Sequence, residues 1–152
     1  MSRAFVKDHD DAPEELPERL VSSAPNLVTA EGLAAIEAEI VRLTAELAAA
    51  DGDDRDARAR IGRDLRYWTA RRGSAHLMPA PADANIVHFG STVTVQRSDG
   101  RRQTFRIVGE DEADPERGTL SHVSPLAQAL LGKSEGDIVR VAGGDAEIAE
   151  IA

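Results

Sequence analysis

Residues 33–75 read LAAIEAEIVRLTAELAAADGDDRDARARIGRDLRYWTARRGSA. The large apolar residues of the first part follow one another at intervals of three and four: Leu33, Ile36, Ile40, Leu43 and Leu47. This is the a/d pattern of a coiled-coil helix. A second apolar series with the same spacing follows residues 51–56: Ile61, Leu65 and Trp68. Two short amphipathic segments around a Gly/Asp-rich corner predict an antiparallel helical hairpin with an acidic tip.

The composition narrows the class of protein. A chain of 152 residues holds one ordinary domain, or a small domain with an appendage. The net charge of −9 argues against a general nucleic-acid binder, although residues 55–72 carry seven Arg and only two Asp. The absence of Cys excludes disulfides and thiolate metal sites. No apolar run matches a membrane span or a signal peptide, so we expect a cytoplasmic protein that makes no membrane contact.

Composition and periodicity divide the chain into four parts. The first residues are rich in acids and proline and have no sustained period, which favours a flexible tail. Thr29 is the predicted N-cap of the first helix, and prolines after Gly73 end the second. We therefore expect a tail at 1–28, a coiled-coil hairpin at 29–77 with its acidic tip at 51–56, a linker at 78–85 and a globular domain at 86–152.

From Ile86 onward the apolar period changes to two, which is typical of strands. Ser124 followed by Pro125 predicts the start of one helix in this part, which Gly132 ends. The predicted strands cover residues 92–96, 103–108, 118–123, 138–141 and 146–151. The expected fold class is therefore α+β, with a helical hairpin followed by a small antiparallel β domain that contains one helix.

Conventional catalytic signals are weak. The four histidines lie far apart in sequence and form no ligand pair, so we expect no metal bound by this chain alone: His9, His76, His88 and His122. Gly132-Lys133-Ser134 follows a helix and lacks the first glycine of a phosphate-binding loop. The chain is therefore not expected to be an enzyme, and we expect it to bind no cofactor by itself.

The acidic corner is the remaining candidate site. Asp53 and Asp56 are three residues apart beside a helix start, so they can share a divalent cation. Two carboxylates are too few for a closed site, so the metal and phosphate would have to come from another molecule. The alternative is that these residues only form the turn and cap the second helix. Two interpretations of the arginines of the second helix stay open. They contact RNA or an acidic protein surface, or they form only a solvated face of the helix. These arginines are Arg55, Arg58, Arg60, Arg63 and Arg66.

The C-terminal half carries sequence motifs in order over about 65 residues: VHFGSTVTV (87–95), FRIVGEDEAD (105–114), SPLAQALLGK (124–133) and GD (136–137). These motifs closely resemble the Gre family of bacterial transcription elongation factors. Four further segments resemble the GreB branch of that family: MSRAFVK (1–7), LPER (16–19), PN (25–26) and LRYWT (65–69).

The resemblance implies an N-terminal coiled coil and a C-terminal domain related in fold to FKBP-type prolyl isomerases. It implies docking of that domain on RNA polymerase at the secondary channel, with Mg²⁺ held at the polymerase's active site by acids of the hairpin tip. Nascent RNA is then an indirect partner, and we expect a monomer. By resemblance, the docking residues are Asp111, Glu112, Ser124, Pro125, Leu126, Gly132 and Lys133.

The tip departs from the family pattern G-D-x-x-E-N. Gly52 and Asp53 match it, but Asp56 stands in place of Glu and Ala57 in place of Asn. Both helical arms are roughly ten residues shorter than usual for the family, which removes about 15 Å of reach.

These departures leave two main hypotheses open. One is a factor that stimulates transcript cleavage through Asp53 and Asp56. The other is a non-cleaving regulator that occupies the channel and competes with full-length factors. A prolyl isomerase is disfavoured because the globular domain has only two aromatic residues, Phe89 and Phe105. A stand-alone coiled-coil adaptor is disfavoured by the C-terminal motifs.

Overall fold

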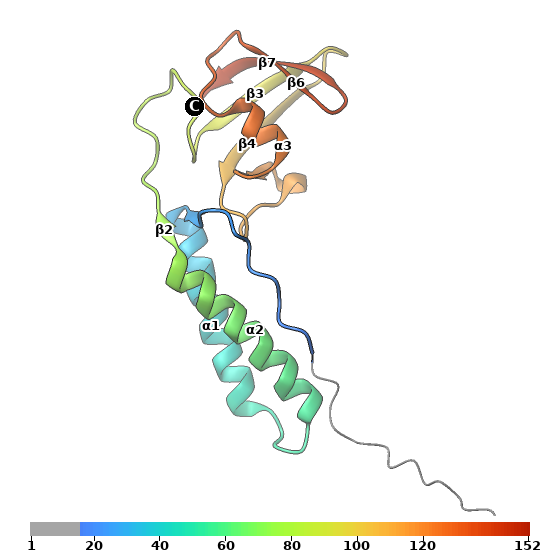
Figure 1. Ribbon diagram of the computed structural model, residues 1–152. Coiled ribbons are helices and arrows are strands. Elements are labelled where there is room, and N and C mark those ends of the chain that lie inside the picture. The colour runs from blue at the N-terminus through green and yellow to red at the C-terminus, as the bar shows by residue number, and fades with distance from the viewer. Residues whose placement is uncertain (1–15) are drawn as a thin grey trace, which may run out of the picture.

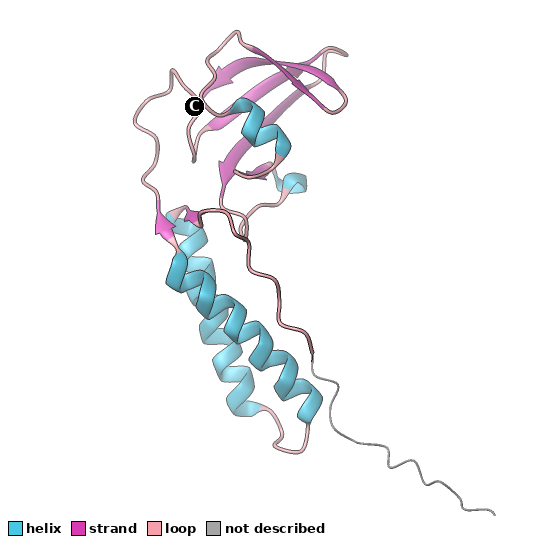
Figure 2. Cartoon of the chain, viewed as in Figure 1, coloured by secondary structure: helices cyan, strands magenta, loops and turns pink. Residues whose placement is uncertain are grey.

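The structure, a computed structural model, describes residues 16–152. A helical hairpin and a β domain lie end to end, with the tip of the hairpin at the far end from the sheet (Figure 1). Figure 2 shows that the hairpin is built from the two long helices and that the strands gather in the other half. The predicted α+β class is confirmed.

The hairpin consists of α1 (Ala30–Ala49) and α2 (Arg55–Ser74). Thr29 caps α1 as predicted, because its side chain accepts a hydrogen bond from Gly32 N at 3.0 Å. Ile36 and Leu43 of the predicted seam are buried between the helices. In a hairpin of two helices, each helix is covered by its partner on one side only. The apolar residues of α2 are accordingly only half-buried: Ile61, Leu65 and Trp68.

The sequence predicts a flexible tail at residues 1–28, and the structure describes its second half. Residues 1–15 lie outside the described part. Residues 16–26, which we call the N-terminal strap, run along α2 (Figure 1). The strap continues into β1 (Leu27–Val28), which pairs in parallel with β2 (His76–Leu77) at the base of the hairpin. Asn26 and Val28 are buried there, at 4% and 2% exposure.

The β domain contains a five-stranded sheet in the order β5-β4-β3-β7-β6. Its strands are β3 (Thr92–Arg97), β4 (Arg102–Val108), β5 (Thr119–Ser121), β6 (Ile138–Val141) and β7 (Gly144–Ile151). Three of the pairs are antiparallel, but β4 and β5 are parallel. The expectation of a purely antiparallel sheet is therefore corrected: the segment between β4 and β5, which includes the 3₁₀ helix η1 (Pro115–Arg117), returns the chain to the same direction.

The core of the β domain is mostly aliphatic. Alternate residues of β3 point inward, so that Val93 and Val95 are fully buried. The short helix α3 (Pro125–Leu130) adds Ala127 and Leu130 to the same cluster. Phe89 belongs to this core and Phe105 packs against it, so both phenylalanines are engaged in packing.

The connection between the hairpin and the sheet, residues 78–91, forms no helix or strand. The expected division of the chain into tail, hairpin, linker and globular domain stays a prediction. Within residues 16–152, no helix has the length and apolarity that crossing a membrane requires.

Candidate functional site

The turn between α1 and α2 uses two of its four acids for local hydrogen bonds. Asp51 Oδ1 accepts a hydrogen bond from Asp53 N at 3.1 Å. Asp54 is the N-cap of α2, and its Oδ1 accepts from Ala57 N at 3.1 Å. Asp51 and Asp54 therefore have a structural explanation, as turn and cap residues.

The other two acids of the tip are the ones that the sequence singles out. Asp53 and Asp56 are exposed, and within residues 16–152 their carboxylates have neither a hydrogen-bond donor nor an ion-pair partner. Asp56 lies in the first turn of α2, where the helix dipole favours a negative charge. No group of three or more metal-ligating side chains occurs in the described part of the chain. The tip therefore offers oxygen ligands but no complete metal site.

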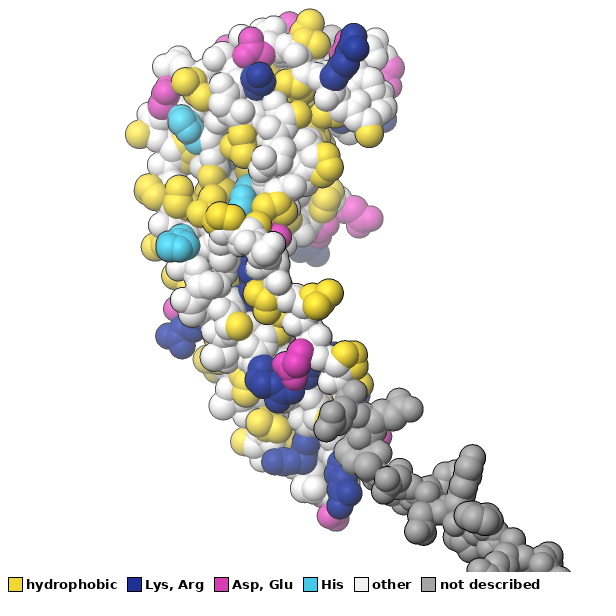
Figure 3. All heavy atoms as spheres, viewed as in Figure 1, with side chains coloured by type: hydrophobic (Ala, Val, Ile, Leu, Met, Phe, Trp, Pro, Cys, Tyr) yellow, Lys and Arg dark blue, Asp and Glu magenta, His cyan; other side chains and the backbone are white. Residues whose placement is uncertain are grey.

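The arginines of α2 divide into two groups. Arg55, Arg58 and Arg60, in the first turns after the tip, are exposed and have no ion-pair partner among the described residues. Arg63 pairs with Asp64 at 3.2 Å, and Arg66 pairs with Glu18 of the strap. Figure 3 shows Lys and Arg side chains spaced along the hairpin toward its tip. In the part of the chain that the structure describes, the arginines of α2 without an ion-pair partner are therefore the three nearest the tip.

The N-terminal strap is held on α2 by contacts that the sequence reasoning missed. Arg66 Nε donates to both carboxylate oxygens of Glu18, at 3.0 and 3.1 Å. The guanidinium of Arg19 lies over the Tyr67 ring, 3.9 Å from its centroid, and 3.5 Å from Asp64. The sequence pointed to this part of the strap only through the motif LPER at 16–19, which resembles the family. Four residues are too few to show a helical or strand periodicity.

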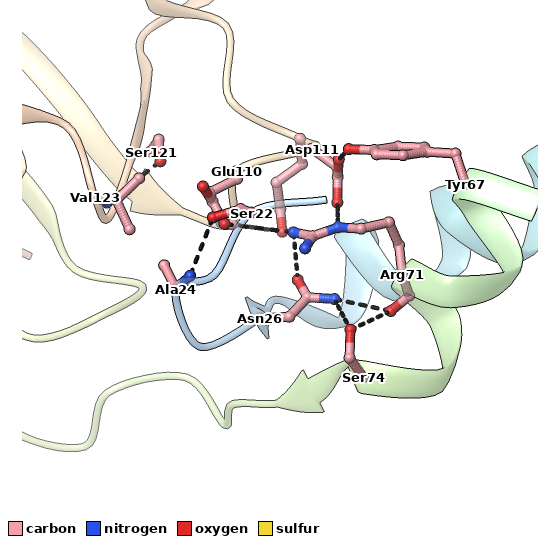
Figure 4. A network of polar contacts seen from close by, with 12 residues as sticks. Ser22, Ala24, Asn26, Tyr67, Arg71, Ser74, Glu110, Asp111, Ser121 and Val123 are labelled. Atoms are coloured by element: carbon pink, nitrogen blue, oxygen red, sulfur yellow. Dashed lines mark hydrogen bonds and ion pairs between the residues drawn. The ribbon is translucent and has the colours of Figure 1, made fainter. Parts of the chain in front are cut away.

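A second polar cluster joins the hairpin to the β domain (Figure 4). Arg71 is 1% exposed, and its Nε donates to Asp111 Oδ2 at 2.6 Å. Arg71 Nη2 also donates to Asn26 Oδ1 at 2.9 Å, and Asn26 Nδ2 donates back to the Arg71 carbonyl at 2.8 Å. Burial alone lowers the pKa of Arg71, but the hydrogen bond and charge of Asp111 outweigh it and the pKa is raised.

Tyr67 belongs to the same cluster. Its hydroxyl donates to Asp111 Oδ1 at 2.5 Å. Burial, together with this hydrogen bond to a carboxylate, raises the pKa of Tyr67 to about 12. The cluster thus joins α2 to the loop after β4 through the Asp111 carboxylate, and α2 to the strap through Arg71 and Asn26.

Glu112 forms the neighbouring contact with α1. Its Oε2 accepts a hydrogen bond from Thr29 N at 3.1 Å, and its Oε1 accepts from the Thr29 hydroxyl. A Cβ at Gly32 would lie 2.0 Å from Glu112 Oε2, so only glycine permits this approach. Asp111 and Glu112, which the family resemblance marks as docking residues, thus have their carboxylates engaged within the chain. Their role in docking stays a prediction.

The remaining predicted docking residues surround α3. Ser124 is the N-cap, with its Oγ accepting from Ala127 N at 3.3 Å, and Leu126 packs against the core. Pro125, Gly132 and Lys133 are exposed. Gly132 has a φ of +81°, so its place at the end of the helix requires glycine. The two ends of α3 are therefore accessible to a partner at Pro125, Gly132 and Lys133, where docking can be tested.

The histidines form no site in the described residues. His76 and His88 are exposed, whereas His9 lies outside the described part. His122 is buried at 5% exposure beside Phe89, and its Nε2 has no partner within residues 16–152. Burial lowers the pKa of His122.

Comparison with known proteins identifies similar chains. A family model described as "Transcription elongation factor, GreA/GreB, C-term" matches residues 82–151. The transcription elongation factor GreA of Desulfovibrio desulfuricans is 34% identical over 134 residues, which cover 75% of this chain and 83% of that protein. GreB of Neisseria meningitidis serogroup A is 43% identical over 81 residues, or 52% of this chain and 50% of that protein.

Other matches are shorter or more distant. GreA of Hyphomonas neptunium is 54% identical over 57 residues, 37% of this chain, so that the match spans 36% of that relative's length. Among solved structures, GreA factor homolog 1 of Thermus thermophilus is 20% identical, with a TM-score of 0.41 over 85% of this chain and 99% of that one.

Proposed function

The chain belongs to the GreA/GreB family of transcription elongation factors, and from that premise we propose that it binds RNA polymerase at the secondary channel and acts on backtracked complexes. In this proposal the β domain docks and the hairpin enters the channel. The polymerase is the catalyst of RNA hydrolysis, so this chain is an activator rather than an enzyme.

The observation that carries the proposal is that two of the four acids of the tip accept local hydrogen bonds and the other two do not. Asp51 and Asp54 are engaged in the turn and the cap, whereas Asp53 and Asp56 have no partner within residues 16–152. The same two residues stand at the acidic positions of the family's tip pattern. Their carboxylates are therefore the groups of the tip that are available to another molecule.

The donor set fits Mg²⁺, which takes oxygen ligands and keeps several positions for water and phosphate. Bound beside a phosphodiester, this ion acts as a Lewis acid and lowers the pKa of a coordinated water. Asp53 and Asp56 would supply two of the oxygen ligands, and Asp56 would hold its charge against the first turn of α2. The remaining ligands have to come from the polymerase and the RNA.

The length of the hairpin supports a second candidate function. Each helix has 20 residues, which corresponds to about 30 Å at 1.5 Å per residue. A tip that stops short of the reacting phosphate would leave a regulator that occupies the channel, does not stimulate cleavage and competes with longer factors.

The test uses a stalled, backtracked elongation complex with 3′-labelled RNA and Mg²⁺. We expect the protein to accelerate the release of short 3′ fragments, and the double variant Asp53→Asn/Asp56→Asn to lose that acceleration while still binding polymerase. The matched control is Asp51→Asn/Asp54→Asn, which removes the same charge from the tip but keeps an amide oxygen for the turn and the cap. The control is expected to retain most of the activity.

Two other outcomes would change the conclusion. No acceleration, combined with inhibition of cleavage by a full-length factor, would support the channel-occupying regulator. An equal loss in both double variants would show that net charge at the tip, and not metal ligation by Asp53 and Asp56, produces the effect.

A further inference from the structure

The N-terminal strap is anchored on the β domain where it enters β1. Leu27, the first residue of β1, packs against the apolar core of that domain. Its carbonyl oxygen approaches Gly109 so closely that a Cβ on this glycine would lie 2.5 Å away. Asn26, the last residue of the strap, exchanges two hydrogen bonds with Arg71 of α2. This end of the strap is therefore fixed against both the sheet and the base of the hairpin.

The other end of the strap contacts the middle of α2, mainly through Arg19. The guanidinium of Arg19 lies 3.9 Å from the centroid of the Tyr67 ring and 5.6 Å from that of Trp68. Asp64, one turn closer to the tip, lies 3.5 Å from the same guanidinium. A cation that faces two aromatic rings and a carboxylate is held more firmly than a cation in a simple exposed ion pair.

The neighbouring contact of Glu18 is weaker. Glu18 pairs with Arg66, but the two side chains are 62% and 61% exposed, so that solvent screens their attraction. The side chain of Arg19 is 38% exposed. Arg19 is therefore the stronger of the two attachments of the strap to α2, beside which the strap runs (Figure 1).

The ring of Tyr67 connects these contacts to the β domain. Its hydroxyl donates to Asp111 in the loop after β4, while Arg19 covers a face of the same ring. Tyr67 is thus held at two points, by the β domain and by the strap. Because the strap is itself anchored on the β domain at Leu27, the three elements form a closed loop of contacts.

The direction of the hairpin matters because the β domain holds it near its base only. The connecting residues 78–91 form no helix or strand. With helices of 20 residues, about 30 Å long, a tilt of about 10° around the base would displace the tip by about 5 Å. Catalytic geometry is sensitive to displacements of about 1 Å. A contact that resists such a tilt would therefore affect the chemistry at the tip.

We propose that the strap braces the hairpin, and that Arg19 is a positioning residue that acts through Tyr67 to keep the tip in place. The bracing requires only the contacts of this chain, whereas its consequence for transcript cleavage rests on the proposed function. From Asp64 to Arg55, the first residue of α2, the helix rises over nine residues, about 14 Å. Arg19 therefore influences the tip acids through the helix and not by contact.

The bracing is tested with two spin labels. The chain has no Cys, so Ala48→Cys and Ala142→Cys place one nitroxide near the tip and one in the turn between β6 and β7, both at exposed positions. Pulsed electron paramagnetic resonance measures the distribution of distances between the labels. We expect one narrow distribution in the labelled chain, and at least twice its width when Arg19→Ala is added.

The matched control is Arg72→Ala, which removes an arginine whose ion-pair partner is Glu37 of α1 and not the strap. It is expected to leave the width unchanged. Arg19→Lys keeps the charge but loses the planar group that stacks on Tyr67, so an intermediate width is expected. Far-UV circular dichroism checks that each variant keeps its helices. An unchanged width in Arg19→Ala, or equal broadening in Arg72→Ala, would overturn the bracing.

The consequence for cleavage is measured on the backtracked elongation complex. In Arg19→Ala we expect the cleavage rate at saturating protein to fall several-fold, and the protein concentration that gives half of this rate to stay the same, because the β domain docks without Arg19. A higher half-saturating concentration with an unchanged maximal rate would overturn the positioning role. If the natural chain gives no acceleration, the proposed function fails, while the distance measurement still decides the bracing.

Discussion

The guanidinium of Arg71 lies 2.6 Å from Asp111 and is almost fully withdrawn from water. A buried charge of this kind is tolerated only while its partners remain, because the unpaired charge would be far from solvent. Its partners lie on two other segments of the chain, the strap and the loop after β4: Asn26, Glu110 and Asp111. This single side chain thus holds together parts of the chain that are far apart in sequence.

Replacing Arg71 tests this interpretation. We expect Arg71→Met to reduce the free energy of unfolding by about 3–5 kcal/mol, because Asp111 loses its charged partner in a buried position. Urea denaturation followed by circular dichroism measures the change. The control is Arg72→Met, since the adjacent Arg72 is 57% exposed and 3.8 Å from Glu37, and it should lose less than about 1 kcal/mol. Similar losses in the two variants would contradict the role of the cluster.

Tyr67 gives this cluster a dependence on alkaline pH. Its pKa is raised from 10.0 to about 12, so the unfolded chain gives up the phenol proton at a lower pH than the folded chain. The contribution of Tyr67 to the free energy of unfolding is therefore complete below the pKa of the unfolded chain, 10.0. It is lost as the pH rises through the pKa of the folded chain, about 12. Because the chain has one tyrosine, its absorbance titration reports Tyr67 directly. Tyr67→Phe should flatten the pH dependence of the urea midpoint across this interval; an unchanged slope would contradict the assignment.

At the scale of elements, the start of α1 and the loop after β4 approach each other at Gly32. A methyl group there would displace Glu112, whose carboxylate accepts from Thr29. The contact fixes where the first helix begins relative to the sheet. A glycine inside a helix normally weakens it, so its presence here is explained by this close approach and not by helix propensity.

Two glycine substitutions separate these effects. Gly32→Ala is expected to lose about 1–3 kcal/mol, because the Thr29 N–H is left without its acceptor. Gly62→Ala, inside α2, meets only the flexible end of Arg66 at 3.4 Å and should gain up to about 1 kcal/mol from helix propensity. Thermal unfolding of the two variants provides the comparison. A gain in both would show that Glu112 moves aside without loss.

At the scale of the whole molecule, the length of the hairpin limits how far the tip acids lie from the β domain. Contacts of Arg71, Asp111 and Glu112 hold the base of the hairpin against the β domain. The 20 residues of α1 then carry the tip about 30 Å from that base. Under the proposed function, we therefore expect the reach of the tip, and not only its carboxylates, to set how strongly the protein stimulates transcript cleavage.

Lengthening both arms by one heptad tests the effect of reach. Seven residues add about 10 Å and keep the a/d seam in register. We expect the extended protein to stimulate transcript cleavage more strongly than the natural chain, and only while Asp53 and Asp56 are present. Adding two residues to each arm rotates the seam and serves as the control for altered packing. Unchanged cleavage by the extended protein would show that reach is not limiting.

The amino-acid sequence by itself determined the features that depend on neighbouring residues. The heptad spacing from Leu33 to Leu47 predicted α1, and the period of two around Val93 and Val95 predicted a strand with one buried face. Ser124 followed by Pro125 predicted the start of α3, because capping is a local hydrogen bond. The sequence also singled out Asp53 and Asp56 as site residues, which stays a prediction; only the structure shows that Asp51 and Asp54 accept hydrogen bonds in the turn and the cap.

The tertiary structure alone decided the features that join distant segments. Arg71 is one of the seven arginines of residues 55–72, and its neighbours in the sequence do not mark it as buried. It is buried because Asn26 and Asp111 approach it from 45 and 40 residues away. The parallel pairing of β4 with β5 and the docking of the strap on Tyr67 likewise depend on contacts between remote segments. Such contacts leave no period in the sequence, since each involves a single residue whose partner is chosen only when the chain has folded.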